Sequence, residues 1–221
     1  MVFLCYGTRP EIIKMAPVAK ALDDLKVPYR TIFTGQHPDL YRDVAELMPT
    51  PHFRLEPPAR GASLTAVFAH ILLGLDRIFL SERPQLVVAQ GDTNTVLAAA
   101  MAAHGQGLAF GHIEAGLRTH DLQNPWPEEG IRQQVSRLAA WHWAPTRQAV
   151  DNLAAEGIQQ GVMLTGNTIV DSCRAFNFPV SYGHEVLVTL HRRENFGAPL
   201  ELLLSQIEAL AVGNPNLQFL F

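Results

Sequence analysis

The chain has 221 residues, of which 48% are hydrophobic, and its 17 basic and 21 acidic side chains give a formal net charge of −4. This length allows one large domain or two small ones, and an acidic balance without a basic tract argues against nucleic acid as a partner. The two cysteines, Cys5 and Cys173, form no CxxC pair, so nothing in the sequence requires an oxidising compartment. We find no signal-peptide pattern and no apolar run of membrane-spanning length. We therefore expect a cytoplasmic protein that is not inserted in a membrane.

The first predicted unit is a strand, a turn and a helix. The apolar run 2–6 predicts a buried strand that ends at a glycine, and Thr8 is a plausible N-cap for the helix that follows. Such a turn presents backbone N–H groups and the positive end of a helix dipole, which suits an anion. Arg9 and Lys14 add two cations nearby. A plain glycine turn with surface basic residues explains the same pattern, because a single glycine replaces the GxGxxG motif.

Strands and helices then alternate along most of the chain. Further strands are predicted over 29–33, 85–90, 108–113, 141–144 and 162–164, and helices over 40–47, 64–80, 96–103, from 128 to about 138 and from 146 to about 156, with a loop and a short edge strand in 49–58. This alternation predicts an α/β fold, a Rossmann-type, mostly parallel sheet with helices on both faces.

The end of the chain predicts the beginning of a second domain. Residues 177–183 contain Pro179 and Gly183 and resemble a linker. A strand over 185–190, a helix over 200–212 and a last strand over 217–221 are too few to cover a parallel sheet. We therefore divide the chain into a domain of residues 1–168, a linker region of residues 169–184 and an incomplete domain of residues 185–221.

Polar side chains follow three of the predicted strands. Gln36 and His37 follow the strand 29–33, Asp92 follows 85–90 and Glu114 follows 108–113. Open α/β sheets hold their ligands at the carboxyl ends of the strands, so these side chains are expected to line one crevice. The simpler explanations are a solvated loop histidine, and a helix cap formed by Asp92 or Thr93.

Residues 111–119 combine a histidine, a carboxylate and an arginine directly after a buried strand. Glu114 has the apolar neighbours Ile113 and Ala115, and such a carboxylate is either paired or available as an acid or base. The alternative is an ordinary i,i+4 ion pair between Glu114 and Arg118 at the start of a helix.

Seven motifs in register resemble the non-hydrolysing UDP-N-acetylglucosamine 2-epimerase family of bacteria. They are GTRPE with KMAP at 7–17, GQH at 35–37, GDT at 91–93, GHIEAGLRT at 111–119, PWPEE at 125–129, GNT at 166–168 and HRRENFG at 191–197. The resemblance runs from the first residue to the last.

The resemblance implies a GT-B-like pair of Rossmann-type domains with the nucleotide sugar between them. It also implies reversible conversion of UDP-GlcNAc to UDP-ManNAc, with UDP as the leaving group and 2-acetamidoglucal as the intermediate. No cofactor and no metal are expected, the pathway is expected to serve polysaccharide biosynthesis, and we expect a homodimer.

The resemblance also assigns roles to residues. Two or more acid or base groups are needed on opposite faces of C2, and cations are needed for the charge that develops on the diphosphate. The acid or base groups implied are Asp92, Glu114 and Glu128. The groups that would contact the nucleotide are Arg9, Lys14 and His191, the last of which we also count among the catalytic residues. Arg118 is expected to orient Glu114, and Gln36 and His37 to border the substrate.

The chain is shorter than members of this family, whose C-terminal domain has a further stretch that holds uridine. We therefore expect the 221-residue chain alone to be inactive or nearly so, because binding of the remote nucleotide positions the reacting sugar. The alternatives are a GT-B glycosyltransferase, a hydrolysing epimerase, or a fragment that binds without turnover.

Overall fold

The computed structural model describes residues 1–36, 42–176, 181–190 and 196–221. By internal contacts the chain divides into two compact units, Met1–Asn177 and Phe178–Phe221. Each unit is described by itself.

The first unit is built on a seven-stranded sheet in the order β3-β2-β1-β4-β5-β6-β7, and every neighbouring pair is parallel. The strands are β1 (Val2–Tyr6), β2 (Tyr29–Phe33), β3 (Phe53–Arg54), β4 (Leu86–Gln90), β5 (Ala109–Ile113), β6 (Trp141–Ala144) and β7 (Val162–Leu164). The predicted α/β fold with a parallel sheet is confirmed.

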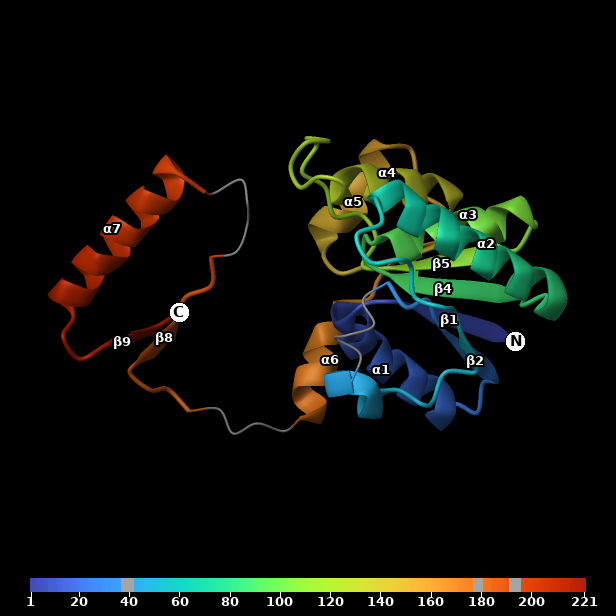
Figure 1. The fold of residues 1–221 in the computed structure, drawn as a ribbon, viewed down its shortest axis with the longest axis horizontal. Coiled ribbons are helices and arrows are strands. Elements are labelled where there is room, and N and C mark those ends of the chain that lie inside the picture. Colours follow the sequence, from blue (N-terminus) through green and yellow to red (C-terminus); the bar gives the residue numbers. More distant parts are fainter. Residues whose placement is uncertain (37–41, 177–180, 191–195) are drawn as a thin grey trace. The chain divides into compact units, whose positions relative to one another are not determined.

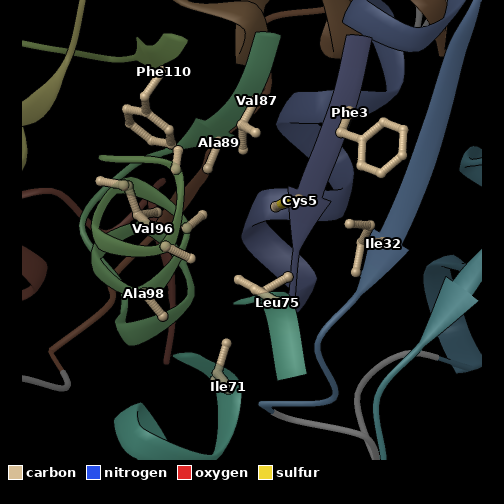
Figure 2. Close-up of a cluster of buried hydrophobic side chains, with 14 of the residues drawn as sticks. Phe3, Cys5, Ile32, Ile71, Leu75, Val87, Ala89, Val96, Ala98 and Phe110 are labelled. Carbon is tan, nitrogen blue, oxygen red and sulfur yellow. The ribbon is translucent and has the colours of Figure 1, made fainter. Parts of the chain in front are cut away.

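Helices cover both faces of the sheet (Figure 1). They are α1 (Arg9–Asp24), the 3₁₀ helix η2 (Arg42–Leu47), α2 (Leu64–Glu82), α3 (Asn94–Gly105), α4 (Glu128–Leu138), α5 (Arg147–Ala155) and α6 (Thr168–Ala175). Two hydrophobic clusters result, because successive strand residues point to opposite faces. Phe3 and Cys5 of β1 face α2, α3 and α4, whereas Leu4 and Tyr6 face α1 and η2. Figure 2 shows the larger cluster, where side chains of β1, β2, β4 and β5 meet those of α2 and α3.

A proline inside α1 explains how α6 packs. Pro17 has no N–H to donate to the carbonyl oxygen of Ile13, one helical turn earlier. Ser172 of α6 supplies the missing donor, with its Oγ 2.6 Å from that oxygen. The two helices contact each other, and Asn167 caps α6 by accepting a hydrogen bond from the amide of Ile169.

Helix α2 extends to Glu82, beyond the predicted helix over 64–80. Leu64–Glu82 has a mean hydropathy of 1.6 over an 18-residue window, enough in length and composition to cross a membrane. The expectation that no apolar run reaches that length is therefore wrong. The helix contributes Ile71, Leu75 and Phe79 to the larger core cluster and packs against α3, which accounts for its apolar side.

Two local predictions differ from the structure. The range 40–47 was expected to form a helix, and its described part is the 3₁₀ helix η2. Residues 168–175 were divided between the first domain and the linker region, whereas they form α6.

The second unit contains β8 (Glu185–Leu187), α7 (Ala198–Gly213) and β9 (Gln218–Leu220). The two strands pair in parallel. None of the residues of α7 is buried, and Leu202, Leu204 and Leu210 are exposed. This unit thus presents a large apolar surface.

Candidate active site

The order of the strands reverses between β1 and β4, because the chain runs outward from β1 to β3 and returns to place β4 on the other side. In open α/β sheets a crevice opens at such a reversal, beyond the carboxyl ends of the strands. The residues just beyond β1, β4 and β5 include Gly7, Asp92 and Glu114. The candidate site lies at this edge.

Glu114 is held in an uncommon backbone conformation at the end of β5. Its φ is 68°, in the left-handed region that non-glycine residues seldom adopt. Its Oε2 accepts hydrogen bonds from Lys14 Nζ, 2.6 Å away, and from the side-chain amide of Gln90. The side chains of Lys14 and Glu114 are only 22% and 13% exposed. Strained residues of this kind concentrate at functional sites, and the structure brings two predicted site residues together here.

Arg118 pairs with a carboxylate other than Glu114. Its fully buried guanidinium donates to both oxygens of Glu156, at 2.6 and 2.9 Å, and to Ser136 Oγ at 2.8 Å. The hydrogen bond from Arg118 also lowers the pKa of Glu156. Residues 114–116 form a turn, so the i,i+4 geometry of a helix start does not exist. The expectation that Arg118 orients Glu114 is wrong, and Arg118 instead ties this loop to α5.

Asp92 forms an ion pair that the sequence did not suggest. Its Oδ2 accepts a hydrogen bond from Arg132 Nε of α4 at 2.9 Å. Thr93 occupies the N-cap position of α3, but no side-chain cap is formed there, and the Thr93 hydroxyl donates to Glu11 at 2.6 Å. A helix cap therefore does not account for either side chain.

Glu128 begins α4 and is the third predicted carboxylate. Its Oε2 is buried and has no hydrogen-bond partner among the described residues. Asp92 and Glu114, by contrast, are each paired with a cation. A buried polar atom without a partner needs an explanation, and none of the described contacts supplies one for Glu128.

Glu129, the next residue, is fully buried and fixes the start of α4. Its oxygens accept hydrogen bonds from the amides of Thr119 and His120 and from the side chains of Arg132 and Gln133, at 3.0 to 3.2 Å. Burial favours the neutral acid, but these donors outweigh it and hold the pKa of Glu129 below its ordinary value.

The turn after β1 does not offer a free anion site. Glu11, 1% exposed, accepts hydrogen bonds from the amides of Gly7 and Thr8 at 2.7 Å each. Burial raises the pKa of Glu11, against the effect of its hydrogen bonds. The expectation that these amides await an anion is therefore wrong, because a side chain of the same helix occupies them.

The other predicted site residues are Gln36, Arg9, His37 and His191, and they differ in their contacts and exposure. Gln36 Oε1 accepts hydrogen bonds from the backbone amide and the hydroxyl of Thr95 at 3.1 and 3.0 Å, which joins the end of β2 to α3. Arg9 is the first residue of α1 and is exposed. His37 and His191 lie outside the described residues.

A buried histidine supports the loop that carries Asp92. His112 of β5 is fully buried, and its Nε2 lies 2.7 Å from the carbonyl oxygen of Gly91. Burial lowers the pKa of His112 to about 4, so the ring is neutral at pH 7 and donates Nε2–H to that oxygen.

Within the described ranges, no group of three His, Cys, Asp or Glu side chains is close enough to hold a metal ion. The absence of a metal from the reaction stays a prediction.

The sequence analysis does not identify four residues whose hydrogen bonds support the candidate site, namely Gln90, Arg132, Glu11 and Glu129. Two of them have a recognisable spacing in the sequence, because Thr8 and Glu11 are spaced as in a capping box and Arg132 follows Glu128 at i+4 on one face of α4. Gln90 and Glu129 meet their partners only through the tertiary fold.

Comparisons with known proteins identify the family. The family model described as UDP-N-acetylglucosamine 2-epimerase matches residues 20–221. This chain belongs to that family. A probable UDP-N-acetylglucosamine 2-epimerase of Ralstonia solanacearum is 38% identical over 241 residues, an alignment that covers 100% of this chain and 64% of the relative. The chain thus spans 60 to 64% of the length of the curated relatives that it matches.

Solved structures of epimerases share the GT-B-like fold. A putative UDP-N-acetylglucosamine 2-epimerase from Listeria monocytogenes gives a TM-score of 0.90 at 32% identity, covering 99% of this chain and 61% of that one. The UDP-GlcNAc 2-epimerase from Neisseria meningitidis, solved with bound UDP-GlcNAc, gives 0.87 at 34% identity, covering 99% and 64%.

Proposed function

We propose that the protein to which these 221 residues belong interconverts UDP-GlcNAc and UDP-ManNAc. The observation that carries this proposal is a pair of carboxylates just beyond neighbouring strands, Asp92 after β4 and Glu114 after β5, each paired with a cation. Glu114 is paired with Lys14, Asp92 is paired with Arg132, and Glu128 has a buried oxygen without a partner. The family and the UDP-GlcNAc bound to the Neisseria neighbour support the choice of substrate.

The proposed reaction begins at C2 of the sugar. A carboxylate takes the C2 proton, the electron pair of that C–H bond forms a double bond between C1 and C2, and the bond from C1 to the diphosphate oxygen breaks on the opposite side. UDP leaves with the electron pair of the broken bond, and 2-acetamidoglucal remains. Addition of UDP to C1 and of a proton to the other face of C2 gives UDP-ManNAc.

The carboxylates supply the acid and base groups that this reaction requires. Glu128, Asp92 and Glu114 differ in their partners, and carboxylates in different environments divide acid and base roles between them. Lys14 contacts Glu114, and its role in this proposal is to receive the negative charge that develops on the leaving group. Arg9 and His191 are proposed for the nucleotide, and Gln36 and His37 for the border of the site. Arg118 is not proposed as a substrate ligand, since its buried guanidinium is committed to Glu156.

We further propose that residues 1–221 are inactive or nearly so by themselves. The relatives have more than a third of their length outside the aligned part, and binding energy from remote parts of a substrate lowers the barrier at the reacting centre. The homodimer and the cytoplasmic location stay predictions.

Product analysis tests the proposed function. An extended chain, residues 1–221 joined to the C-terminal part that the Ralstonia solanacearum relative has beyond the alignment, is incubated with UDP-GlcNAc. We expect UDP-ManNAc and no net loss of nucleotide sugar. Free ManNAc with UDP would indicate a hydrolysing epimerase, and transfer of the sugar to an added acceptor would indicate a glycosyltransferase.

A further inference from the structure

We propose that Arg132 is a positioning residue that holds Asp92 for proton transfer and is itself fixed by the buried carboxylate of Glu129. The inference rests on the proposed function, because it gives Arg132 a task in that reaction.

The first argument is the geometry of the guanidinium. Arg132 Nε donates to Asp92 Oδ2 at 2.9 Å, and Arg132 Nη1 donates to Glu129 Oε2 at 3.1 Å. The N–H groups of arginine lie in one rigid plane, so a contact at one nitrogen fixes the direction of the others. A carboxylate bound to this guanidinium is therefore held in orientation as well as in position.

The second argument is the stiffness of the anchor. Glu129 is fully buried, and besides Arg132 it binds the amides of Thr119 and His120 and the side chain of Gln133. Four donors from the loop and the helix hold its two oxygens. Arg132 is thus fixed to a part of the structure that has little freedom to move.

The third argument is the place of Arg132 on α4. Arg132 follows Glu128 by four residues, so the two side chains lie on the same face of the helix. One helix therefore presents a carboxylate of the site and holds a second carboxylate that comes from the loop after β4. Arg132 therefore links Asp92 to the helix that begins with Glu128.

An ordinary surface ion pair is the simpler explanation, and such pairs contribute little. The Arg132 side chain is only 12% exposed and bridges two carboxylates from different parts of the chain, which a solvated pair would not do. A direct contact between Arg132 and the diphosphate is a second explanation, and kinetics separate it from positioning. Loss of a binding contact raises KM, whereas loss of positioning lowers kcat.

The contact itself is tested on the 221-residue polypeptide by nitrogen-15 NMR of arginine side chains. The Arg132 Nε–H signal is identified by its loss in Arg132→Lys. We expect this signal to shift in Asp92→Asn and in Glu129→Gln, and to stay in place in Asp121→Asn, a change at an exposed residue of the neighbouring loop. If the Arg132 Nε–H signal does not shift in Asp92→Asn, the positioning role is overturned, whether or not the protein is an epimerase.

The effect of this contact on catalysis is tested by deuterium incorporation at C2 of UDP-GlcNAc in deuterated water, with the extended chain. Arg132→Ala is expected to lower kcat about 100-fold, as displacement of a reacting group by about 1 Å can do, with KM little changed and with partial rescue by added guanidinium. Arg132→Lys keeps the charge but cannot bridge both carboxylates, so it should remain impaired. Arg137→Ala, at an exposed residue of the same helix, is the matched control.

The possible outcomes distinguish a failure of the positioning role from a failure of the proposed function. A raised KM with unchanged kcat, or an Arg132→Ala variant as active as Arg137→Ala, overturns positioning and leaves the proposed function standing. A wild-type extended chain without exchange overturns the proposed function, and with it any part for Arg132 in proton transfer.

Discussion

His112 makes stability depend on pH through its burial. The pKa of His112 is about 4 in the folded chain and 6.5 for an ordinary histidine, because burial disfavours the charged ring. The unfolded chain therefore binds a proton between these values and the folded chain does not. The contribution of His112 is fully present above pH 6.5 and is lost as the pH falls toward 4.

We predict that lowering the pH from 6.5 to 4 costs up to about 3 kcal/mol of unfolding free energy through His112. The measurement is urea unfolding at a series of pH values, with His112→Gln for comparison, since glutamine does not titrate in this range. Equal pH slopes for the wild type and His112→Gln would contradict this account.

Glu128 is the residue whose replacement should affect chemistry most directly. Glu128→Gln keeps the size of the side chain but removes its ability to exchange a proton, and general acid–base groups typically contribute 10²-fold or more. Deuterium incorporation at C2 by the extended chain should fall by at least about 100-fold.

Glu46→Gln, a change at an exposed glutamate of η2, is the control and should leave exchange unaltered. Normal exchange in Glu128→Gln would remove Glu128 from the proton-transfer groups.

The position of several candidate site residues beyond the strands could be predicted from the sequence, but most of their partners could not. The position of Glu114 after a buried strand indicated the sheet edge, and the structure places it there. Its partner Lys14 is 100 residues away in the chain, and the expected partner Arg118 binds Glu156 instead. Local spacing cannot decide between these partners, because the turn at 114–116 and the packing of α5 determine where Arg118 points.

At the scale of elements, the contact between α1 and α6 shows how a hydrogen-bond donor missing from one helix is replaced by a side chain of another. Pro17 leaves the carbonyl oxygen of Ile13 without its helical donor, and Ser172 supplies a hydroxyl. Ser172 is 5% exposed, so water has little access to this oxygen once the hydroxyl is removed.

We predict that Ser172→Ala lowers the unfolding free energy by about 1 to 3 kcal/mol, the cost of leaving a buried acceptor unpaired. Chemical unfolding measures this loss. Pro17→Ala restores an N–H to the helix, so Ser172→Ala should cost less in a Pro17→Ala background. An equal cost in both backgrounds would show that the Ser172 hydroxyl does not serve the oxygen exposed by Pro17.

The strands were predictable because their apolar runs end at glycine or polar residues, and a parallel sheet buries them on both faces. The N-terminal bounds of α1 also followed from local signals, namely Thr8 at the cap position and proline in the first turn. Helix α6 was missed because it is short, with one buried residue, Ser172. Its docking depends on Pro17, more than 150 residues earlier in the chain.

At the scale of the whole molecule, the two units differ in how they bury apolar side chains. The first unit has two core clusters, whereas α7 of the second has no buried residue and exposes several leucines. Large apolar surfaces of this kind bind hydrophobic dyes and partners.

We therefore predict that the 221-residue polypeptide binds the dye ANS strongly in its native state. A polypeptide of residues 1–177 should bind much less, and so should the extended chain. Equal dye fluorescence in all three would show that the exposed surface belongs to the first unit.

The most direct test of the account is proton NMR of UDP-GlcNAc in deuterated water with the extended chain, with residues 1–221 measured beside it. We predict that deuterium enters at C2 and that UDP-ManNAc signals grow with the extended chain, and that residues 1–221 alone exchange far more slowly. UDP-GlcNAc that binds to the extended chain but keeps its C2 proton would contradict the claim that this edge of the sheet performs proton transfer at C2.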